Sequence, residues 1–384
     1  MAWIVFDARK IRDYGVGTHI QGLLPALMRQ APPSFQWLLL APMEAQPLLA
    51  SLLPDTGSTV RVEWTRARPF EWRTHVEIPW RVRRHVDGPC VFHAPYFPVP
   101  MGLRCPVVLT LHDAILLEVW PRRAGPWVAR FARWLIGWSA ERSACVVTVS
   151  QTAARQILHY FPGLADKIHV IPNGIHPAFR VPIGTDEVER QCRTLGLPPR
   201  EYLLYVGNDK PHKNLHRLIE VCIDLWRQQL MTHRLVLAGM PEAAWRRTVR
   251  RYYPWTQLGW VRWVPYCDVE TLRAVYAGAA ALVQPSLDEG FGLPVVEAMA
   301  VGTPVVCSRA GALPEVAGDA AVYFDPTDPT EMAQAIRRVL EDQDLRSACR
   351  ERGRRRACQF RWEDAADRFL ALYDRLWILG ARTV

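Results

Sequence analysis

Short apolar runs alternate with amphipathic stretches along most of this chain. Two series of runs have the length and composition of buried strands. The first series comprises Trp3–Phe6, Trp37–Leu40, Cys90–His93, Val107–Leu111, Val146–Val149 and Ile168–Ile171. The second comprises Tyr202–Val206, Leu235–Ala238, Val261–Val264, Ala281–Gln284, Pro304–Cys307 and Ala321–Phe324. Continuously apolar strands separated by helical patterns are typical of parallel sheets covered by helices on both faces, so we predict an α/β fold.

The two series predict two doubly wound domains rather than one. The 384 residues exceed the roughly 250–300 residues at which a single core stops growing. Helical periodicity between the strands is clearest over Leu215–Leu230, Val269–Ala279 and Pro329–Glu341. We predict a first domain over residues 1–178, a second over residues 179–361, and a helix over residues 362–384 that packs back toward the first domain.

The charge of the chain is unevenly distributed. Residues 1–180 contain 20 Lys and Arg against 12 Asp and Glu, whereas residues 181–384 contain 27 against 26. Nearly all of the net charge of +9 therefore belongs to the first half, which suggests an anionic partner there.

Composition narrows the class of protein. A hydrophobic fraction of 49% argues against a largely disordered chain. No apolar run approaches the roughly 18 residues of a membrane span, and the start MAWIVFDARK lacks the pattern of a signal peptide. Nine cysteines without a CxxC pair indicate reduced thiols, so we expect a cytoplasmic protein.

Open parallel sheets bind ligands beyond the carboxyl ends of their strands, and two features of the first half lie at such positions. Gly15 and Gly17 follow the first strand and would let backbone amides approach an anion at a helix N-terminus. The third position of a GxGxxG fingerprint is Ile20, which argues against a dinucleotide site. The strand PVVLTL is followed by His112, which could donate a hydrogen bond to a polar ligand or merely to a backbone carbonyl.

The loop after the strand EYLLYV reads GNDKPHKNL and contains two of the four lysines of the chain, Lys210 and Lys213. A lysine at a strand-to-helix turn can neutralise a diphosphate as a mobile point charge. A solvated loop is the alternative. Since the chain uses arginine almost everywhere else, we favour a ligand.

The most specific feature is the stretch ALVQPSLDEGFGLPVVEAMAVG, which begins at residue 281. A strand ends there, Glu289 lies in a glycine-rich turn, and Glu297 lies in the first turn of the next helix. The free amides of residues 290–293 would point into the same crevice. Ionised carboxylates are strong acceptors, so Glu289 and Glu297 can hold separate hydroxyl groups of one sugar-containing ligand.

The segment Trp127–Trp138 places four aromatic residues and a leucine on one helical face, with Arg130 and Arg133 on the other. Such a helix could lie in a membrane interface. Because a buried strand follows it, we interpret it as a crossover helix whose aromatic residues pack on a sheet.

These motifs together resemble the retaining glycosyltransferases of family 4. That family has the GT-B architecture, in which two Rossmann-like domains face each other across a cleft. The stretch EGFGLPVVEAMAVGTPVV is similar to the E-x7-E signature of the family. Further similarity lies in VGNDKPHKNL, HDAILLEVWP, VSQTAARQI, IPNGIHPAF and GALPEVAGDAAVYFDP.

The resemblance implies a nucleotide-sugar donor site in the second domain and an acceptor site on the first. Lys213 would bind the donor diphosphate, Glu297 the ribose, and Glu289 the transferred sugar. The implied donor-binding set is Gly15, Gly17, Asn208, Lys210, Lys213, Glu289, Gly290, Phe291, Gly292, Leu293 and Glu297, and the catalytic set is His112, Glu289 and Lys213. No metal and no cofactor besides the nucleotide sugar as co-substrate is expected.

One position departs from the pattern of the family. Many members have an arginine five residues before the lysine of the phosphate loop, where this chain has Asn208. An asparagine cannot replace the charge, so Lys210 or an arginine from elsewhere would have to supply it.

The combination of PHKN with EGFGLP resembles members that use GDP-mannose, which makes an α-mannosyltransferase the first choice. Members that use UDP-glucose, UDP-N-acetylglucosamine or dTDP-rhamnose share most of these residues. The acceptor would be a saccharide or lipid-linked saccharide in polysaccharide or glycolipid synthesis. Basic residues at 61–84, Arg122 and Arg123 would then face an anionic membrane at its cytoplasmic surface.

Three other classes of protein would explain part of these observations. A nucleotide-dependent dehydrogenase would require the intact glycine fingerprint that is missing. A nucleic-acid-binding protein would explain the charge through Arg66, Arg68, Arg73, Arg81, Arg83 and Arg84 but not the two glutamates, so we expect no nucleic-acid partner. A non-catalytic nucleotide-sugar-binding protein would share the site and form no product.

Overall fold

The computed structural model describes residues 2–53, 59–117, 125–253 and 255–381 and divides the chain into two compact units. Unit 1 consists of Met1–Gly174 and Arg361–Val384, and unit 2 of Ile175–Phe360. The chain enters and leaves unit 2 at adjacent positions, because the amide of Ile175 donates to the carbonyl of Phe360 at 3.2 Å. Arg122 and Arg123, the end of the HDAILLEVWP motif and residues 382–384 lie outside the described residues.

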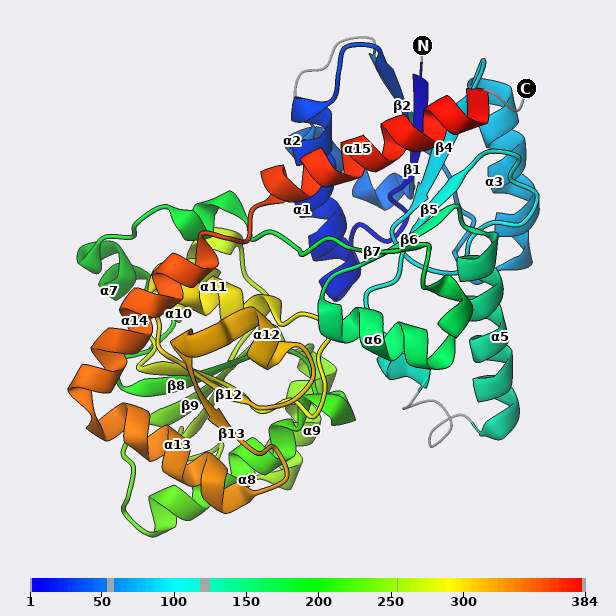
Figure 1. Cartoon of the computed structure of the whole chain (residues 1–384). Helices are drawn as coiled ribbons and strands as arrows, with labels where there is room; N and C mark the ends of the chain where they lie inside the picture. Colours follow the sequence, from blue (N-terminus) through cyan, green and yellow to red (C-terminus); the bar gives the residue numbers. More distant parts are fainter. Residues whose placement is uncertain (1, 54–58, 118–124, 254, 382–384) are drawn as a thin grey trace. The chain divides into compact units, whose positions relative to one another are not determined.

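Unit 1 contains a parallel sheet of seven strands in the order β3-β2-β1-β4-β5-β6-β7 (Figure 1). The strands are β1 (Ala2–Asp7), β2 (Phe35–Ala41), β3 (Val60–Trp64), β4 (Cys90–Ala94), β5 (Val107–Thr110), β6 (Cys145–Thr148) and β7 (Ile168–Val170). Six of them confirm the predicted positions. The strand β3 was not predicted, because this half-exposed edge strand alternates apolar and charged residues.

Helices cover both faces of this sheet. Their bounds are α1 (Tyr14–Gln30), α2 (Gln46–Leu52), α3 (Trp72–His85), α5 (Pro126–Arg142), α6 (Gln151–Tyr160) and α15 (Trp362–Ala381), with 3-10 turns η1 (Met43–Ala45) and η3 (Pro162–Leu164). Residues of α1, α2 and α15 pack into the core on one face. Residues of α3, α5 and α6 pack into the core on the other.

The C-terminal helix α15 docks tightly on unit 1. A Cβ atom at Gly22 would lie 2.1 Å from the indole of Trp362, and one at Gly174 would lie 2.2 Å from the Trp362 backbone nitrogen. These glycines therefore form the socket for the first residue of α15. Further along the helix, the hydroxyl of buried Tyr373 lies 2.5 Å from Nδ1 of His93 in β4.

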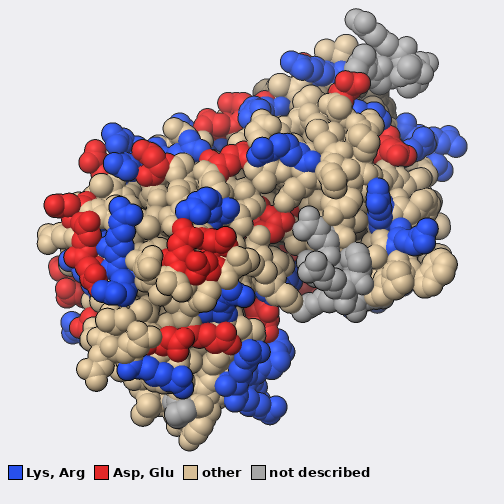
Figure 2. All heavy atoms as spheres, turned by 60° about the horizontal axis from the view of Figure 1, so that its bottom comes forward, with Lys and Arg blue, Asp and Glu red and all other residues tan. Residues whose placement is uncertain are grey.

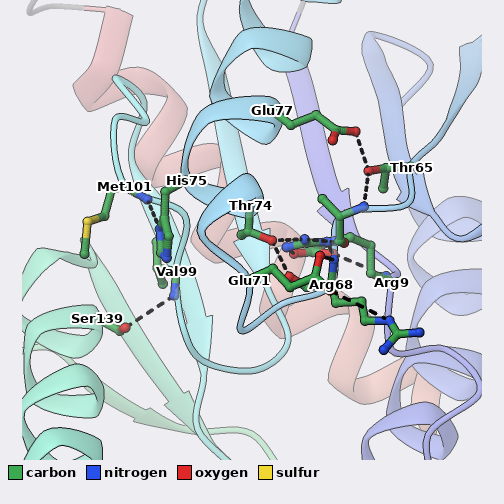
Figure 3. Close-up of polar contacts among 12 residues, drawn as sticks. Arg9, Thr65, Arg68, Glu71, Thr74, His75, Glu77, Val99, Met101 and Ser139 are labelled. Atoms are coloured by element: carbon green, nitrogen blue, oxygen red, sulfur yellow. Dashed lines mark hydrogen bonds and ion pairs between the residues drawn. The ribbon is translucent and has the colours of Figure 1, made fainter.

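A buried ion pair between Arg9 and Asp7 lies at the carboxyl edge of this sheet, and Figure 3 shows Arg9 beside Thr74. Arg9 donates to both carboxylate oxygens of Asp7 at 2.8 and 2.7 Å. The same guanidinium donates to the carbonyl of Ala67 at 3.0 Å and the hydroxyl of Thr74 at 2.7 Å. These contacts hold the end of β1 to the start of α3. They also give the buried guanidinium of Arg9 the partners that a buried charge requires.

Unit 2 contains a parallel sheet of six strands in the order β10-β9-β8-β11-β12-β13. The strands are β8 (Tyr202–Val206), β9 (Arg234–Ala238), β10 (Val261–Val264), β11 (Ala281–Gln284), β12 (Val305–Ser308) and β13 (Ala321–Phe324). All six lie where the apolar runs predicted them. The sheet core is apolar and includes Leu203, Leu237, Val283 and Val306.

The helices of unit 2 follow the doubly wound pattern. They are α7 (Thr185–Thr194), α8 (Leu215–Arg227), α9 (Glu242–Arg251), α10 (Val269–Gly278), α11 (Leu293–Val301), α12 (Leu313–Ala317), α13 (Pro329–Glu341) and α14 (Gln343–Ala357), with 3-10 turns η4 (Pro177–Arg180), η5 (Pro211–Lys213) and η6 (Gly318–Ala320). The predicted bounds of α13 are confirmed. The side chain of Asp328 caps it by accepting from the amides of Thr330 and Glu331.

The interpretation of the aromatic helix as a core element is wrong for most of its aromatic residues. In α5, Trp127, Phe131 and Trp134 are exposed by 80, 61 and 53%. The sheet is contacted instead by a face of small and aliphatic residues, Ala132, Leu135, Ile136, Ser139 and Ala140. Because the small and aliphatic side chains of this face allow α5 to approach the sheet closely, the adjacent aromatic face remains at the surface.

No helix in the part of the chain that the structure describes is long and apolar enough to cross a membrane. On the face shown in Figure 2, basic and acidic side chains are interspersed rather than gathered into one continuous patch.

Candidate functional site

Two loops meet at the carboxyl edge of the sheet in unit 2. One connects β8 to α8, and the other connects β11 to α11; β8 and β11 are hydrogen-bonded neighbours. The amide of Leu287 donates to the carbonyl of His212 at 2.7 Å. Asn214, in a left-handed conformation with φ 55°, donates from its side chain to the carbonyl of Pro285 at 3.1 Å. These contacts hold the predicted lysine loop against the predicted glutamate turn.

Lys213 and Glu289 form a direct ion pair. Nζ of Lys213 lies 2.7 Å from Oε1 and 2.9 Å from Oε2 of Glu289. Glu289 is buried and also accepts from Ser286 at 2.7 Å and from Gln284 at 3.0 Å. Burial alone would raise the pKa of Glu289, but the charge of Lys213 and these hydrogen bonds bring that pKa below its ordinary value. The carboxylate is therefore ionised at neutral pH, although it is buried.

The turn that carries Glu289 is shaped by a glycine from another loop. Gly311 has φ +55°, and a Cβ atom there would lie 2.4 Å from the backbone nitrogen of Glu289. The next residue, Ala312, donates its amide to the carbonyl of Glu289 at 2.9 Å. Any side chain at position 311 would displace the turn.

The N-terminus of α11 offers unpaired backbone donors next to this ion pair. Gly292 precedes the helix with φ +99°, and a Cβ atom there would lie 2.6 Å from the side chain of Leu313. Among the described residues, no acceptor is in place for the amides of Phe291, Gly292 and Leu293. The Phe291 side chain is buried and packs edge-on against Phe360, so its backbone is the part that a ligand can use. Such amides stabilise negative charge and hydroxyl oxygens.

Glu297 lies one turn further along α11. Its Oε2 accepts from the hydroxyl of Tyr276 at 2.7 Å, and among the described residues Oε1 has no partner. Burial raises the pKa of Glu297 to about 7, against the hydrogen bond from Tyr276. Near neutral pH this carboxylate therefore retains a free oxygen for a ligand hydroxyl and titrates easily.

The lysine loop has a charged neighbour, Arg247, that no sequence motif marks. The Asn208 side chain orders the loop by accepting from the amide of Lys210 at 3.2 Å. Arg247 of α9 reaches Asp209 in the same loop at 2.5 Å. It thus brings a guanidinium to the residue that follows Asn208, where it is paired with Asp209, while Lys210 is exposed.

In unit 1, Gly15 and Gly17 lie inside the first turn of α1. A Cβ atom at Gly17 would lie 2.6 Å from the carbonyl oxygen of Ile11, which explains that glycine by packing. Nothing lies within 4 Å of a Cβ at Gly15. The side chain of Asp13 does not cap the helix, so its first amides remain available to an anion.

His112 contacts a backbone carbonyl with one ring nitrogen. Its Nε2 lies 3.0 Å from the carbonyl oxygen of Pro95 and must donate to it. Burial lowers the pKa of His112 to about 4, and the charge of Lys10 contributes. The ring is therefore neutral with its lone pair on Nδ1. Of the two predicted alternatives, the structure has the hydrogen bond to a backbone carbonyl, and toward a ligand hydroxyl the ring can accept a hydrogen bond but not donate one.

Several residues of the site carried little or no signal in the sequence. Gln284 and Ser286 stand at the end of β11, a position that parallel sheets use for ligands. Tyr276 of α10 and Arg247 of α9 come from helices in which no motif marks them. Lys10 pairs with Asp13, which precedes α1, at 3.7 Å, and its place after β1 was its only signal.

No group of three or more His, Cys, Asp or Glu side chains within the described ranges is arranged to hold a metal ion. The expectation of a metal-independent site remains a prediction.

Two protein-family models match the chain in succession. The model "Glycosyltransferase Family 4" matches residues 14–179, and "Glycosyl transferases group 1" matches residues 189–356. The chain is 31% identical over 301 residues to O-antigen chain mannosyltransferase B of Escherichia coli, with 77% of both proteins covered. It is 28% identical over 353 residues to D-inositol 3-phosphate glycosyltransferase of Corynebacterium diphtheriae, covering 83% of this chain and 82% of that protein.

A solved structure supports the same fold over the whole chain. The Anabaena protein HepE, crystallised with UDP and glucose, matches with a TM-score of 0.73 and 18% identity, covering 97% of this chain and 99% of that one. The GT-B fold class predicted from the sequence is confirmed.

Proposed function

Because this chain belongs to glycosyltransferase family 4, we propose that it transfers mannose from GDP-mannose to a saccharide or lipid-linked saccharide. The chain is a glycosyltransferase. What we propose is the identity of the donor, the identity of the acceptor and the roles of individual residues. It rests mainly on one observation, the ion pair of Lys213 and Glu289 beside the free amides of α11.

This arrangement suits the departure of a nucleoside diphosphate. When the bond between the anomeric carbon and the phosphate oxygen breaks, negative charge develops on that oxygen and positive charge on the sugar ring. Lys213 and the amides of α11 would stabilise the first, and the ionised Glu289 the second. The acceptor oxygen would bond to the same face of the anomeric carbon, and its proton would pass to the departing phosphate. Configuration is then retained without a covalent glycosyl-enzyme.

The nucleoside would lie near Glu297. Its free oxygen can accept from ribose hydroxyls while Tyr276 holds the other oxygen. The donor diphosphate would contact Lys213, with Lys210 and Arg247 available in place of the arginine missing at Asn208.

The choice of mannose is supported by the similarity to O-antigen chain mannosyltransferase B. Thermal stabilisation by GDP-mannose, UDP-glucose, UDP-N-acetylglucosamine and dTDP-rhamnose should rank the donors, and release of the nucleoside diphosphate should follow that ranking. Faster release from another sugar nucleotide would contradict mannose. Stabilisation without product, for every acceptor offered, would support the non-catalytic alternative. Since one relative is named for D-inositol 3-phosphate, that compound belongs among the acceptors.

Contact with an anionic membrane is the second part of the proposal, and α3 and α5 support it. Trp72, Val76 and Trp80 form an exposed stripe on α3, beside exposed Arg73 and Arg84. The aromatic residues of α5 are exposed beside Arg130 and Arg133 in the same way. Both helices cover the same face of the sheet in unit 1. Tryptophan with arginine suits the headgroup region of a bilayer, where one part of the side chain is wet and the other apolar.

Co-sedimentation with vesicles tests this contact. The full chain should bind vesicles of phosphatidylglycerol and phosphatidylcholine, and binding should fall at least tenfold in the Trp127→Ser/Phe131→Ser/Trp134→Ser variant. The matched control is Tyr253→Ser/Tyr266→Ser, which removes equally exposed aromatic residues from unit 2. Equal loss in the control, or binding that is indifferent to the anionic lipid, would contradict the proposal.

A further inference from the structure

A cavity of about 770 Å³ lies at the amino edge of the sheet in unit 2. The segment Leu197–Arg200 in its wall precedes β8, Ala279 precedes β11, and Gly302 precedes β12. Because all strands of this sheet are parallel, the ion pair of Lys213 and Glu289 lies at the opposite, carboxyl edge. The cavity is therefore separate from the donor site.

Four arginines line this cavity, namely Arg193, Arg200, Arg350 and Arg354. Within the described parts of the chain, no ion pair or hydrogen bond engages any of their four guanidinium groups. Glu189 is the one carboxylate in the wall. Apolar residues from Ile183, Val188, Leu197, Ala279 and Val301 complete it.

Three of these arginines, Arg200, Arg350 and Arg354, lie close enough for their charges to interact. The guanidinium of Arg354 lies directly over Gly302, where a Cβ atom would come within 2.5 Å of it. Arg350 is half-buried, and burial together with the charges of Arg200, Arg346 and Arg354 lowers its pKa. Arg193, Arg200 and Arg354 are exposed, so the cavity is open to solvent, and an anion that enters it would relieve the repulsion between these like charges.

The dipoles of three helices offset only part of the positive charge of these arginines. The C-termini of α7, α10 and α11 lie in the wall of the cavity, and each carries roughly half a negative charge. Together they offset about one and a half positive charges. The four guanidinium groups and the carboxylate of Glu189 together carry more positive charge than the helix ends offset, so a positive excess remains.

We propose that this cavity binds an organic anion carrying two or more phosphate charges. Arginine pairs with phosphate through two parallel hydrogen bonds, and four unpaired guanidinium groups provide for more than one phosphate. The apolar wall would hold the less polar body of the ligand. The volume is within the range of small-molecule sites.

Binding there should not compete with the donor. The helix α11 has its N-terminus at the donor site and its C-terminus at Gly302, in the wall of the cavity. Its nine residues separate the two ends by about 13 Å. A ligand bound at one end of α11 would therefore not be displaced by a ligand that binds at the other end.

Calorimetric titration with inorganic tripolyphosphate tests the site at low ionic strength. The wild-type chain should bind at two places, the diphosphate region at Lys213 and the arginine cavity. Lys213→Gln should abolish the first and keep the second, whereas Arg350→Gln/Arg354→Gln should weaken the second at least tenfold and keep the first. Arg250→Gln/Arg338→Gln removes two exposed arginines elsewhere in unit 2 and should change neither.

Chemical modification of the wild-type chain provides a test that needs no variant. Tripolyphosphate should slow the reaction of phenylglyoxal with Arg350 and Arg354 several-fold, and should not slow it at Arg250 or Arg338. The proposal would be overturned by two undiminished binding events in Arg350→Gln/Arg354→Gln. Equal reactivity of the cavity arginines with and without tripolyphosphate would overturn it as well.

Discussion

Nζ of Lys213 donates hydrogen bonds to both carboxylate oxygens of Glu289, at 2.7 and 2.9 Å. The two residues proposed to contact different parts of the donor are thus partners of each other in this structure. A diphosphate that binds Lys213 would compete with the carboxylate for the same ammonium group, which links donor binding to the charge and position of Glu289.

The first prediction concerns this pair. Glu289→Gln keeps the shape of the side chain and removes the charge that would stabilise the sugar ring, so the rate of transfer should fall at least about 100-fold. Lys213→Gln should reduce the rate by a similar factor. Lys210→Gln, in the same loop but exposed, should have a clearly smaller effect. Rates should be measured as release of nucleoside diphosphate, with folding checked by circular dichroism. Near-wild-type rates in Glu289→Gln would refute the proposed role.

The second prediction follows from the pKa of Glu297, which is raised to about 7. If the ionised carboxylate binds the ribose, the competent form of the free enzyme is lost as pH falls through this value. The kcat/KM for the donor should then decrease about tenfold between pH 8 and pH 6. Glu297→Gln should lower kcat/KM and flatten this part of the profile. A profile that keeps its slope in Glu297→Gln would assign the titration to another group.

The third prediction concerns Gly311. Replacing it by alanine places a Cβ 2.4 Å from the backbone of Glu289 and adds strain at φ +55°. We expect Gly311→Ala to displace the Glu289 turn and reduce kcat at least about tenfold. Gly184→Ala is the control, because nothing lies within 4 Å of its Cβ and its φ is −70°. Unchanged kinetics in Gly311→Ala would show that the turn tolerates a shift.

Much of the fold could be predicted because buried parallel strands are continuously apolar. The exceptions have physical causes. The strand β3 lies at an edge and is half exposed, so it carries the charged residues Arg61 and Glu63. The aromatic face of α5 is as apolar as a core face, and only packing decides which of two adjacent faces meets the sheet.

Motifs pointed to some residues of the candidate site, but not to the contacts between them. Motifs identified Lys213 and Glu289, yet their pairing depends on β8 and β11 being neighbours, which joins residues 76 apart in sequence. His112 was placed at the right strand end, but the direction of its hydrogen bond depends on the carbonyl of Pro95. The arginine cavity brings together arginines from positions 193 to 354, and no local pattern unites them.

The last prediction concerns the attachment of the C-terminal helix to unit 1. Tyr373 is fully buried, and its hydroxyl lies 2.5 Å from Nδ1 of His93, whose Nε2 lies 3.0 Å from the hydroxyl of Thr110. Burial lowers the pKa of His93 to about 3, so the ring is neutral and one of its two nitrogens must accept. Tyr373→Phe leaves a buried ring nitrogen without its partner, which should cost about 1–3 kcal/mol of unfolding free energy.

Urea denaturation of the full chain, followed by circular dichroism, measures this cost. The control is Tyr253→Phe, since Tyr253 is exposed by 64% and the loss of its hydroxyl should change stability by less than about 0.5 kcal/mol. The triple variant Tyr373→Phe/His93→Phe/Thr110→Val removes all three polar groups of this series of hydrogen bonds, and should recover part of the loss if the unpaired nitrogen is its cause. Equal stability of Tyr373→Phe and the wild type would show that the hydrogen bond does not fasten α15 to the sheet.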